Sequence, residues 1–271
     1  WLFDTPDGQV PATNAAASNV TCAAVYSGRL VLGLSDGRIA VLDAETGKLV
    51  KTIPAPAPEG MAFGKFGRLY ALLGGRVSVV DIDSGNLTPV DLPGVGRATA
   101  VAVDKDGNIV VADCGPDCQV KAFSPNGEPL YTCGIKGGRA LCGPFDENGM
   151  SAMSSVAVDR KGHIWVAENS EFPRRVSVWN RKGDLVRDYI GNGAYAGAGA
   201  YLREDDPDLA YYGPCEFRLN RRRMTWELTQ VLWAPDAEKN EFFPLVPSPS
   251  GAQILTTQVS GRNRTYLYSH D

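Results

Sequence analysis

Residues 101–128 read VAVDKDGNIVVADCGPDCQVKAFSPNGE, and residues 156–184 read VAVDRKGHIWVAENSEFPRRVSVWNRKGD. Each stretch contains two apolar runs around a glycine turn, then a variable loop, a third apolar run and a second glycine turn. Paired glycine turns of the same kind occur at Gly28 and Gly47, and at Gly67 and Gly85. A period of about 40 residues with several short strands is typical of a β-propeller.

Extending this period along the 271 residues predicts an all-β chain that forms a single β-propeller domain over 1–271. The length fits six blades of four antiparallel strands, with irregular blades at the end of the chain. The strand missing from the sixth blade is expected from the N-terminus, where residues 1–4 read as strand material, because closure removes open sheet edges. The predicted blades lie at about 19–53, 59–92, 98–133, 154–190, 199–233 and 241–270.

Alternation of apolar and polar residues also predicts individual strands. In the first two blades, the best strands are expected at 20–26, 29–34, 38–43, 48–53, 68–73 and 76–81. In the last two blades, they are expected at 200–202, 209–212, 215–220, 225–233, 242–246, 252–258 and 264–268.

The composition excludes some classes of function. The net charge is −4 with a pI near 5.3, so the chain lacks the basic stripe that nucleic-acid binding needs. The one basic cluster, Arg221 to Arg223, lies between two apolar strands and predicts a solvated hairpin turn. No run of 18 apolar residues occurs, which predicts no membrane span. The chain begins at Trp1 without a signal peptide, which is expected for a mature form or for part of a longer chain or assembly.

Four of the six cysteines form close pairs in loops, Cys114 with Cys118 and Cys133 with Cys142. This spacing predicts two disulfides and hence an oxidising compartment, so we expect a secreted, extracellular or periplasmic protein. Zinc is the weaker interpretation, because the chain contains only two histidines. Cys22 and Cys215 are left over, either free or paired across blades.

The two repeats resemble those of NHL-repeat β-propellers. The resemblance rests on the pattern VAVDxxGxIxVAD/E, a variable loop and xVxxF/W before a glycine turn, over 101–123 and 156–179. The first blade, with RIAVLDAETGKLV at 38–50, is equally similar to PQQ-type and YVTN-type propeller repeats. Such families include enzymes, carbohydrate binders and protein-interaction modules, so the resemblance implies a fold and leaves the activity open.

The resemblance also indicates which kinds of propeller enzyme this sequence could match. Amidating lyases and streptogramin lyases of this architecture rely on channel histidines, whereas this chain has only His163 and His270. Lactonase-like propellers hold a divalent cation with Glu, Asn and Asp side chains. The matching metal candidates here are Asp113, Glu168 and Asn169, and Ca²⁺ is the one cofactor considered, since hard oxygen ligands also occur in the DENG turn at 146–149. No GxSxG motif occurs, and no catalytic residue is assigned.

Loop lengths indicate where a site is expected. The loops between second and third strands lie on the same face as the blade-to-blade crossings, and they grow from GG at 74–75 to DCGPDC at 113–118 and ENSEFPRR at 168–175. Long loops on a rigid scaffold usually carry function. We therefore expect a ligand- or partner-binding site on this face, over blades three to five. The candidate residues are Arg139, Phe145, Asp146, Glu168, Asn169, Arg174 and Tyr195.

Several of these residues also have a structural interpretation. Asp113 and Glu168 end equivalent strands and are expected to bond turn backbone, and Arg174 and Arg175 are expected to pair with neighbouring carboxylates. Phe123 and Trp179 occupy equivalent strand positions, which predicts core packing.

Two functions remain open. The first is a secreted, non-catalytic binding or scaffold propeller whose loop-rich face holds a protein, glycan or assembly partner. The alternative is a lactonase-like hydrolase or lyase that depends on a divalent cation in the channel.

Overall fold

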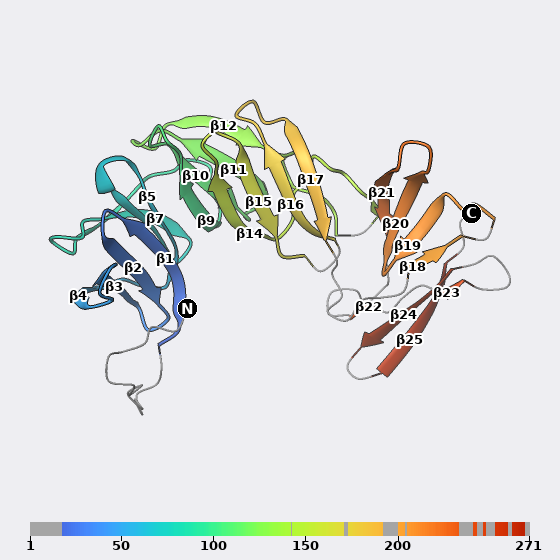
Figure 1. The fold of residues 1–271 in the computed structure, drawn as a ribbon, viewed down its shortest axis with the longest axis horizontal. Helices are drawn as coiled ribbons and strands as arrows, with labels where there is room; N and C mark the ends of the chain where they lie inside the picture. The colour runs from blue at the N-terminus through green and yellow to red at the C-terminus, as the bar shows by residue number, and fades with distance from the viewer. Residues whose placement is uncertain are drawn as a thin grey trace. The chain divides into compact units, whose positions relative to one another are not determined.

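The computed structural model describes residues 18–141, 143–170, 173–191, 200–203 and 205–232, and the backbone of strands at 241–242, 246–247, 253–259 and 262–268. The fold is all-β and is built of antiparallel sheets, and in the first four sheets each strand pairs with its neighbour in sequence (Figure 1). The chain divides into two compact units, 1–90 and 91–271, and each is described by itself. The N-terminal strand predicted at 1–4 lies outside the described residues.

The first unit contains two four-stranded sheets. The first sheet consists of β1 (Val20–Tyr26), β2 (Arg29–Leu34), β3 (Arg38–Asp43) and β4 (Leu49–Pro54). The second consists of β5 (Pro58–Phe63), β6 (Leu69–Leu73), β7 (Arg76–Val80) and β8 (Leu87–Pro89), with one turn of 3₁₀ helix, η1 (Lys65–Gly67), between β5 and β6. The predicted bounds of β1, β2 and β3 are confirmed residue for residue.

The apolar faces of these two sheets form one core. Val31 and Ile39 from the first sheet pack with Leu69 and Val80 from the second, and all four side chains are buried. The middle strand β6 is buried at all five positions, as expected for a strand covered on both faces.

The second unit begins with two further four-stranded sheets. The third sheet consists of β9 (Ala98–Val103), β10 (Ile109–Asp113), β11 (Gln119–Phe123) and β12 (Pro129–Cys133). The fourth consists of β14 (Met153–Val158), β15 (Ile164–Glu168), β16 (Arg174–Trp179) and β17 (Leu185–Gly191).

The register of these two sheets confirms the sequence repeat. Ile109 pairs with Phe123 and Ile164 pairs with Trp179. Phe123 and Trp179 are both buried in the core, as predicted. The repeat unit is therefore a four-stranded antiparallel meander, which is consistent with a propeller-type arrangement.

The fifth sheet differs from the prediction by one strand. β18 (Ala200–Leu202), β19 (Leu209–Tyr212), β20 (Cys215–Asn220) and β21 (Thr225–Val231) follow the predicted order. A short fifth strand, β13 (Gly143–Pro144), pairs antiparallel with the outer edge of β21. β13 comes from the long connection between β12 and β14, where no strand was predicted. Its two residues are too few to give a periodic signal.

The sixth sheet contains four strands, and two of them are short and pair with different parts of β24. β22 (Glu241–Phe242) and β23 (Val246–Pro247) pair with the same side of β24 (Gln253–Val259), and β25 (Arg262–Tyr268) pairs with the other side. The predicted strands at 252–258 and 264–268 correspond to β24 and β25, whereas most of the strand predicted at 242–246 lies outside the described residues.

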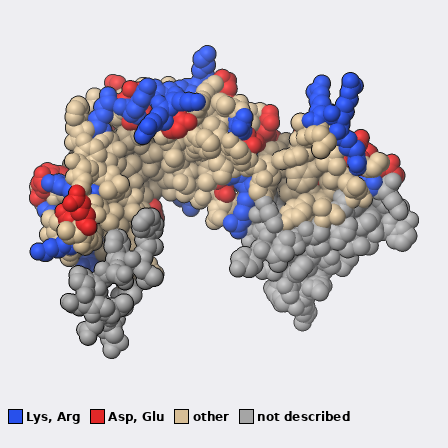
Figure 2. All heavy atoms as spheres, in the orientation of Figure 1, with Lys and Arg blue, Asp and Glu red and all other residues tan. Residues whose placement is uncertain are grey.

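Carboxylate side chains close turns between strands. The Asp104 carboxylate accepts from the backbone N–H groups of Asp106 and Asn108, at 2.8 and 2.9 Å. The basic residues Arg221, Arg222 and Arg223 are exposed, and basic side chains project from the tip of the β20–β21 hairpin (Figure 2). Among the described residues, no helix is long and apolar enough to span a membrane.

Candidate functional site

The predicted site residue Glu168 lies at the end of β15, directly opposite Arg175 on β16. Its carboxylate forms ion pairs with Arg175 Nη1, at 3.1 Å, and with Arg139 Nη2. It also accepts from the backbone N–H of Ser151 at 3.1 Å. All three charged side chains are almost completely buried. We call Glu168, Arg139, Arg175 and Phe145 the Glu168 network.

Arg175 is held on every side within this network. Its Nε donates to Asp188 at 2.7 Å, its Nη1 donates to the carbonyl of Gly149 at 2.7 Å, and its Nη2 donates to the carbonyl of Glu147. The Phe145 ring lies 5.1 Å from the Arg139 guanidinium and 5.7 Å from that of Arg175. The Arg175 guanidinium therefore has no nitrogen left for a ligand.

Arg139 is held less completely. Its Nε and Nη1 are buried and have no hydrogen-bond partner in the described part of the chain. An uncompensated buried donor destabilises the fold. Among the described residues, Arg139 forms an ion pair with Glu168, whereas Arg175 pairs with both Glu168 and Asp188, so two carboxylates balance the two guanidiniums.

Asp113 is the equivalent residue at the end of β10, and it is bonded in the same way. Lys121 Nζ lies 2.8 Å from its carboxylate, and the N–H groups of Arg97 and Gly115 donate at 2.8 and 2.9 Å. Burial alone raises the pKa of Asp113, but the Lys121 ammonium and the backbone donors outweigh it, so the pKa lies below its usual value. The predicted backbone-bonding role of Asp113 is thus confirmed.

The two carboxylates do not fit the predicted cation site. Each one already faces one or two buried cationic side chains, which would repel a divalent ion. Asn169 is exposed, whereas Glu168 is buried. The described residues contain no cluster of three or more His, Cys, Asp and Glu side chains able to hold a metal.

The remaining predicted site residues lie apart from the network or outside the described chain. Asp146 and Arg174 are exposed. Asp146 accepts from the backbone N–H of Asn148 at 2.9 Å, which closes the DENG turn. Tyr195 lies outside the described residues. The structure therefore brings together Arg139, Phe145 and Glu168, and adds Arg175.

The cysteine prediction needs correction. Cys114, Cys118 and Cys133 are free thiols in the structure, and Cys142 lies outside the described residues. Cys114 Sγ lies 3.4 Å from the carbonyl oxygen of Met153, and Cys118 Sγ lies 3.3 Å from that of Met150. Each thiol thus has a backbone acceptor without a disulfide. The cysteines therefore give no structural support for an oxidising compartment.

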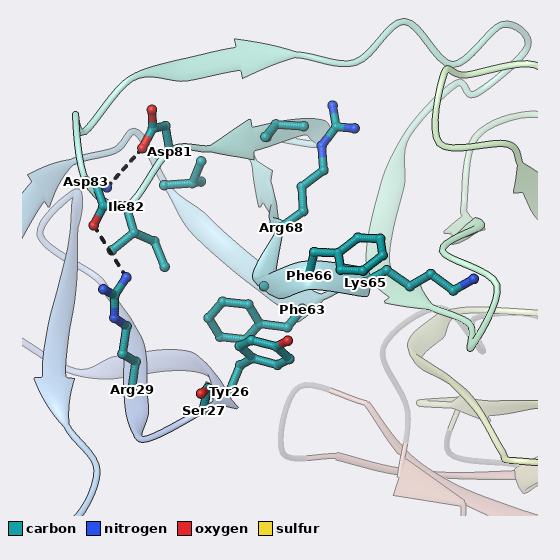
Figure 3. Close-up of a pocket in the computed structure, with 13 residues that line it drawn as sticks. Tyr26, Ser27, Arg29, Phe63, Lys65, Phe66, Arg68, Asp81, Ile82 and Asp83 are labelled. Carbon is teal, nitrogen blue, oxygen red and sulfur yellow. Dashed lines mark hydrogen bonds and ion pairs between the residues drawn. The ribbon is translucent and has the colours of Figure 1, made fainter.

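A pocket that the sequence analysis did not identify lies in the first unit (Figure 3). Its volume is about 640 Å³. It is formed by the β1–β2 turn, η1 and the β7–β8 turn. These turns lie at the opposite end of their strands from the β2–β3 and β6–β7 loops. The predicted site lies on the face of those loops, over blades three to five. The lining residues are Tyr26, Ser27, Arg29, Phe63, Lys65, Phe66, Gly67, Arg68 and residues 79–83.

Three of the thirteen residues that line this pocket are aromatic. The rings of Tyr26 and Phe63 stack with centroids 5.4 Å apart, whereas the Phe66 ring points away from them, next to Lys65 (Figure 3). Phe66 is 97% exposed, and its backbone is left-handed, with φ of 58°. That conformation costs a non-glycine residue about 1–2 kcal/mol. Neither burial nor local backbone preference therefore explains a phenylalanine here.

The equivalent turn of the first sheet shows that phenylalanine is not needed for the turn itself. YSGR at 26–29 and KFGR at 65–68 occupy equivalent positions before β2 and β6. Ser27 and Phe66 both have positive φ, and each precedes a glycine with positive φ. The sequence signal for this pocket is the phenylalanine at position 66, where the equivalent turn has a serine at position 27.

The pocket is electrostatically unbalanced. Arg29 pairs with Asp83 at 3.4 Å, and the Asp81 carboxylate accepts from the backbone N–H groups of Asp83 and Ser84. Lys65 and Arg68 are exposed, and no ion pair is found for them among the described residues. Two cations beside exposed rings can take a negatively charged ligand that also carries an apolar group.

No family model matches the chain, and no curated protein matches it. Among solved structures, it is similar to a protein of unknown function from Bacteroides caccae. That match has 20% sequence identity and a TM-score of 0.46, and it covers 87% of this chain and 85% of the other.

Proposed function

We propose that this protein is a non-catalytic binding protein whose Phe66 pocket takes an acidic segment of a partner protein that carries an apolar side chain. The observation that carries the proposal is Phe66, which is 97% exposed in a strained conformation that a smaller polar residue would adopt more easily. Strained and exposed residues occur where binding compensates for the cost.

The chemistry of the pocket favours a protein partner. Exposed aromatic rings flanked by arginine are typical of the few residues that dominate protein–protein binding energy. The Tyr26 and Phe63 pair offers an apolar surface, while Lys65 and Arg68 are positioned to attract carboxylates.

The sheets themselves support a propeller as the scaffold. The first four sheets are sequential four-stranded meanders, and equivalent positions recur between the third and fourth sheets. We therefore propose that the six sheets are the blades of one closed NHL-like ring. A closed ring of this length should have a radius of gyration of about 18 Å in small-angle X-ray scattering. A value above about 22 Å would contradict closure.

The binding proposal is tested with an array of fluorescent peptides that vary in Asp, Glu and apolar content. Peptides with an acidic run next to Leu or Phe should bind the wild type in fluorescence polarisation, and binding should weaken as salt rises. Phe66→Asn should weaken binding at least about 10-fold, as expected for the loss of a hot-spot residue.

Met224 provides a matched control. It is also an apolar residue in a turn, 88% exposed and with φ of 53°, but it does not line the pocket. Met224→Asn should leave peptide binding unchanged. Equal loss of binding in both variants, or binding to an acidic glycan array without peptide binding, would overturn the proposed partner.

A further inference from the structure

The loop between β10 and β11 begins and ends with a cysteine, and the two side chains interact. Cys114 directly follows β10, and Cys118 directly precedes β11. A tight turn joins them, in which the N–H of Cys118 donates to the carbonyl of Gly115 at 3.1 Å. The side chains of Cys114 and Cys118 lie close enough for each to affect the pKa of the other. Both are half-buried, so reagents from solvent can reach them.

The surrounding backbone holds this pair in place. Cys118 has a left-handed backbone, with φ of 46°. Gly138 packs against it so closely that a Cβ added at Gly138 would lie 2.8 Å from the Cys118 sulfur. A non-glycine residue keeps such a conformation only where its surroundings impose it, and this is common at functional positions.

Loss of both thiol hydrogens would not leave the neighbouring backbone unsatisfied. The Met150 carbonyl also accepts from the N–H of Arg139 at 3.0 Å. The Met153 carbonyl also accepts from the Thr99 hydroxyl at 2.8 Å. Since each carbonyl keeps a second donor, a bond between the two sulfurs creates no buried orphan acceptor.

The two thiols are also electrostatically different. Interaction with the Cys118 side chain is the main cause that lowers the pKa of Cys114 to about 6, and Thr99, the Met153 backbone and Arg97 act in the same direction. The same contact and burial raise the pKa of Cys118. By contrast, burial raises the pKa of Cys133 and that of Cys215 to about 12. Cys114 is therefore the nucleophilic thiol and Cys118 the resolving one.

We propose that Cys114 and Cys118 form a reversible redox pair that small disulfides, such as oxidised glutathione, convert to an intramolecular disulfide. The Cys114 thiolate attacks one sulfur of the external disulfide, and the other sulfur leaves as a thiolate that takes a proton from water. Cys118 then loses its proton and attacks the Cys114 sulfur, which releases the second small thiol. Two electrons pass from the protein to the external disulfide, and two small thiols are formed.

The first test measures thiol reactivity on the native wild-type chain. Iodoacetamide labelling at pH 4–10, read by peptide mass spectrometry, should give Cys114 a midpoint near pH 6. At pH 7, Cys114 should react at least about 100-fold faster than Cys133 and Cys215, because only the thiolate reacts. In Cys118→Ala, the Cys114 midpoint should rise by about one pH unit or more. Equal labelling of Cys114 and Cys133 would overturn the proposal.

The second test titrates the wild type with glutathione redox buffers and maps the products. A Cys114–Cys118 disulfide should form and reverse on reduction, whereas Cys118→Ala should retain one glutathione on Cys114. A chain that stays reduced in fully oxidised glutathione, or whose disulfide joins other cysteines, would contradict the proposal. Both tests are independent of peptide binding at Phe66, so failure of one proposal leaves the other intact.

Discussion

The Glu168 network and the Phe66 pocket contain the same kinds of side chain in opposite situations. In the network, two guanidiniums, a carboxylate and a ring contact one another and exclude solvent. In the pocket, Lys65, Phe66 and Arg68 face outward, and only Arg29 is paired with a carboxylate. The density of charged residues in a sequence does not locate a binding site, because those charges can satisfy one another. The informative feature is a group that the fold leaves exposed or strained without a structural reason.

The energetics of the two regions should differ accordingly. Removal of one partner from a buried ion pair leaves an uncompensated charge, which is strongly destabilising. Removal of an exposed ring has little effect on folding, because the ring is already in water. We therefore expect network variants to lower the stability of the fold and pocket variants to leave it nearly unchanged. A network variant without effect, or a pocket variant that unfolds the protein, would contradict this expectation.

The largest effect is expected for Glu168→Gln. This change keeps the shape of the side chain but leaves Arg139 and Arg175 without their shared carboxylate. Urea unfolding should show a loss of about 3–5 kcal/mol. The control is Asp83→Asn, which removes an exposed ion pair with Arg29 and should leave the unfolding midpoint unchanged. A loss below about 1 kcal/mol in Glu168→Gln would show that the network is not a structural unit.

An intermediate loss of stability is expected for Asp113→Asn. This variant tests Asp113 against its equivalent, Glu168. Lys121 keeps a second partner in Asp117, at 2.8 Å, so the loss at pH 7 should be about 2 kcal/mol, smaller than for Glu168→Gln.

The same variant should change the pH dependence of stability. The pKa of Asp113 is lowered in the folded state, so its contribution is present above the unfolded value of about 3.9 and is lost as pH falls through the folded value. The difference between wild type and Asp113→Asn in urea unfolding should therefore shrink from pH 5 to pH 2. A constant difference over this range would contradict the assignment.

The smallest effect, and the opposite sign, is expected for Phe66→Asn. Asparagine tolerates the left-handed conformation better than phenylalanine does, and the lost ring is almost fully exposed. Unfolding should therefore show a gain of up to about 1 kcal/mol. Phe66→Ala keeps a residue that disfavours this conformation and should show a smaller gain. A loss of stability in both variants would mean that Phe66 is a packing residue.

The sequence predicts repetitive features well and single contacts poorly. The apolar alternation and glycine turns define strands such as Arg29–Leu34 and Arg38–Asp43 to the residue, because both signals repeat locally. The equivalence of Phe123 and Trp179 likewise follows from the repeat. The sequence also placed Arg139, Phe145 and Glu168 among the candidate site residues. It could not show that Arg139 pairs with Glu168 and lies against the Phe145 ring.

Other features depend on contacts between segments far apart in sequence. The partner of Glu168 on the long connection is Arg139, 29 residues away, and no periodicity reports such a distance. The Phe66 pocket combines turns from two sheets, and the thiols of Cys114 and Cys118 contact the carbonyls of Met153 and Met150, more than 30 residues away. Spacing alone predicted a disulfide because it cannot show what else the sulfurs contact.

The short strand β13 has a consequence for how the protein behaves at high concentration. It covers the outer edge of β21 through Gly143 and Pro144. An uncovered edge would offer free N–H and C=O groups to the strand of another molecule, which is a common route to aggregation. Proline at the new edge has no N–H to donate. The long connection after β12 therefore protects Gln230 and Val231, at one end of this edge, from pairing with a strand of another molecule.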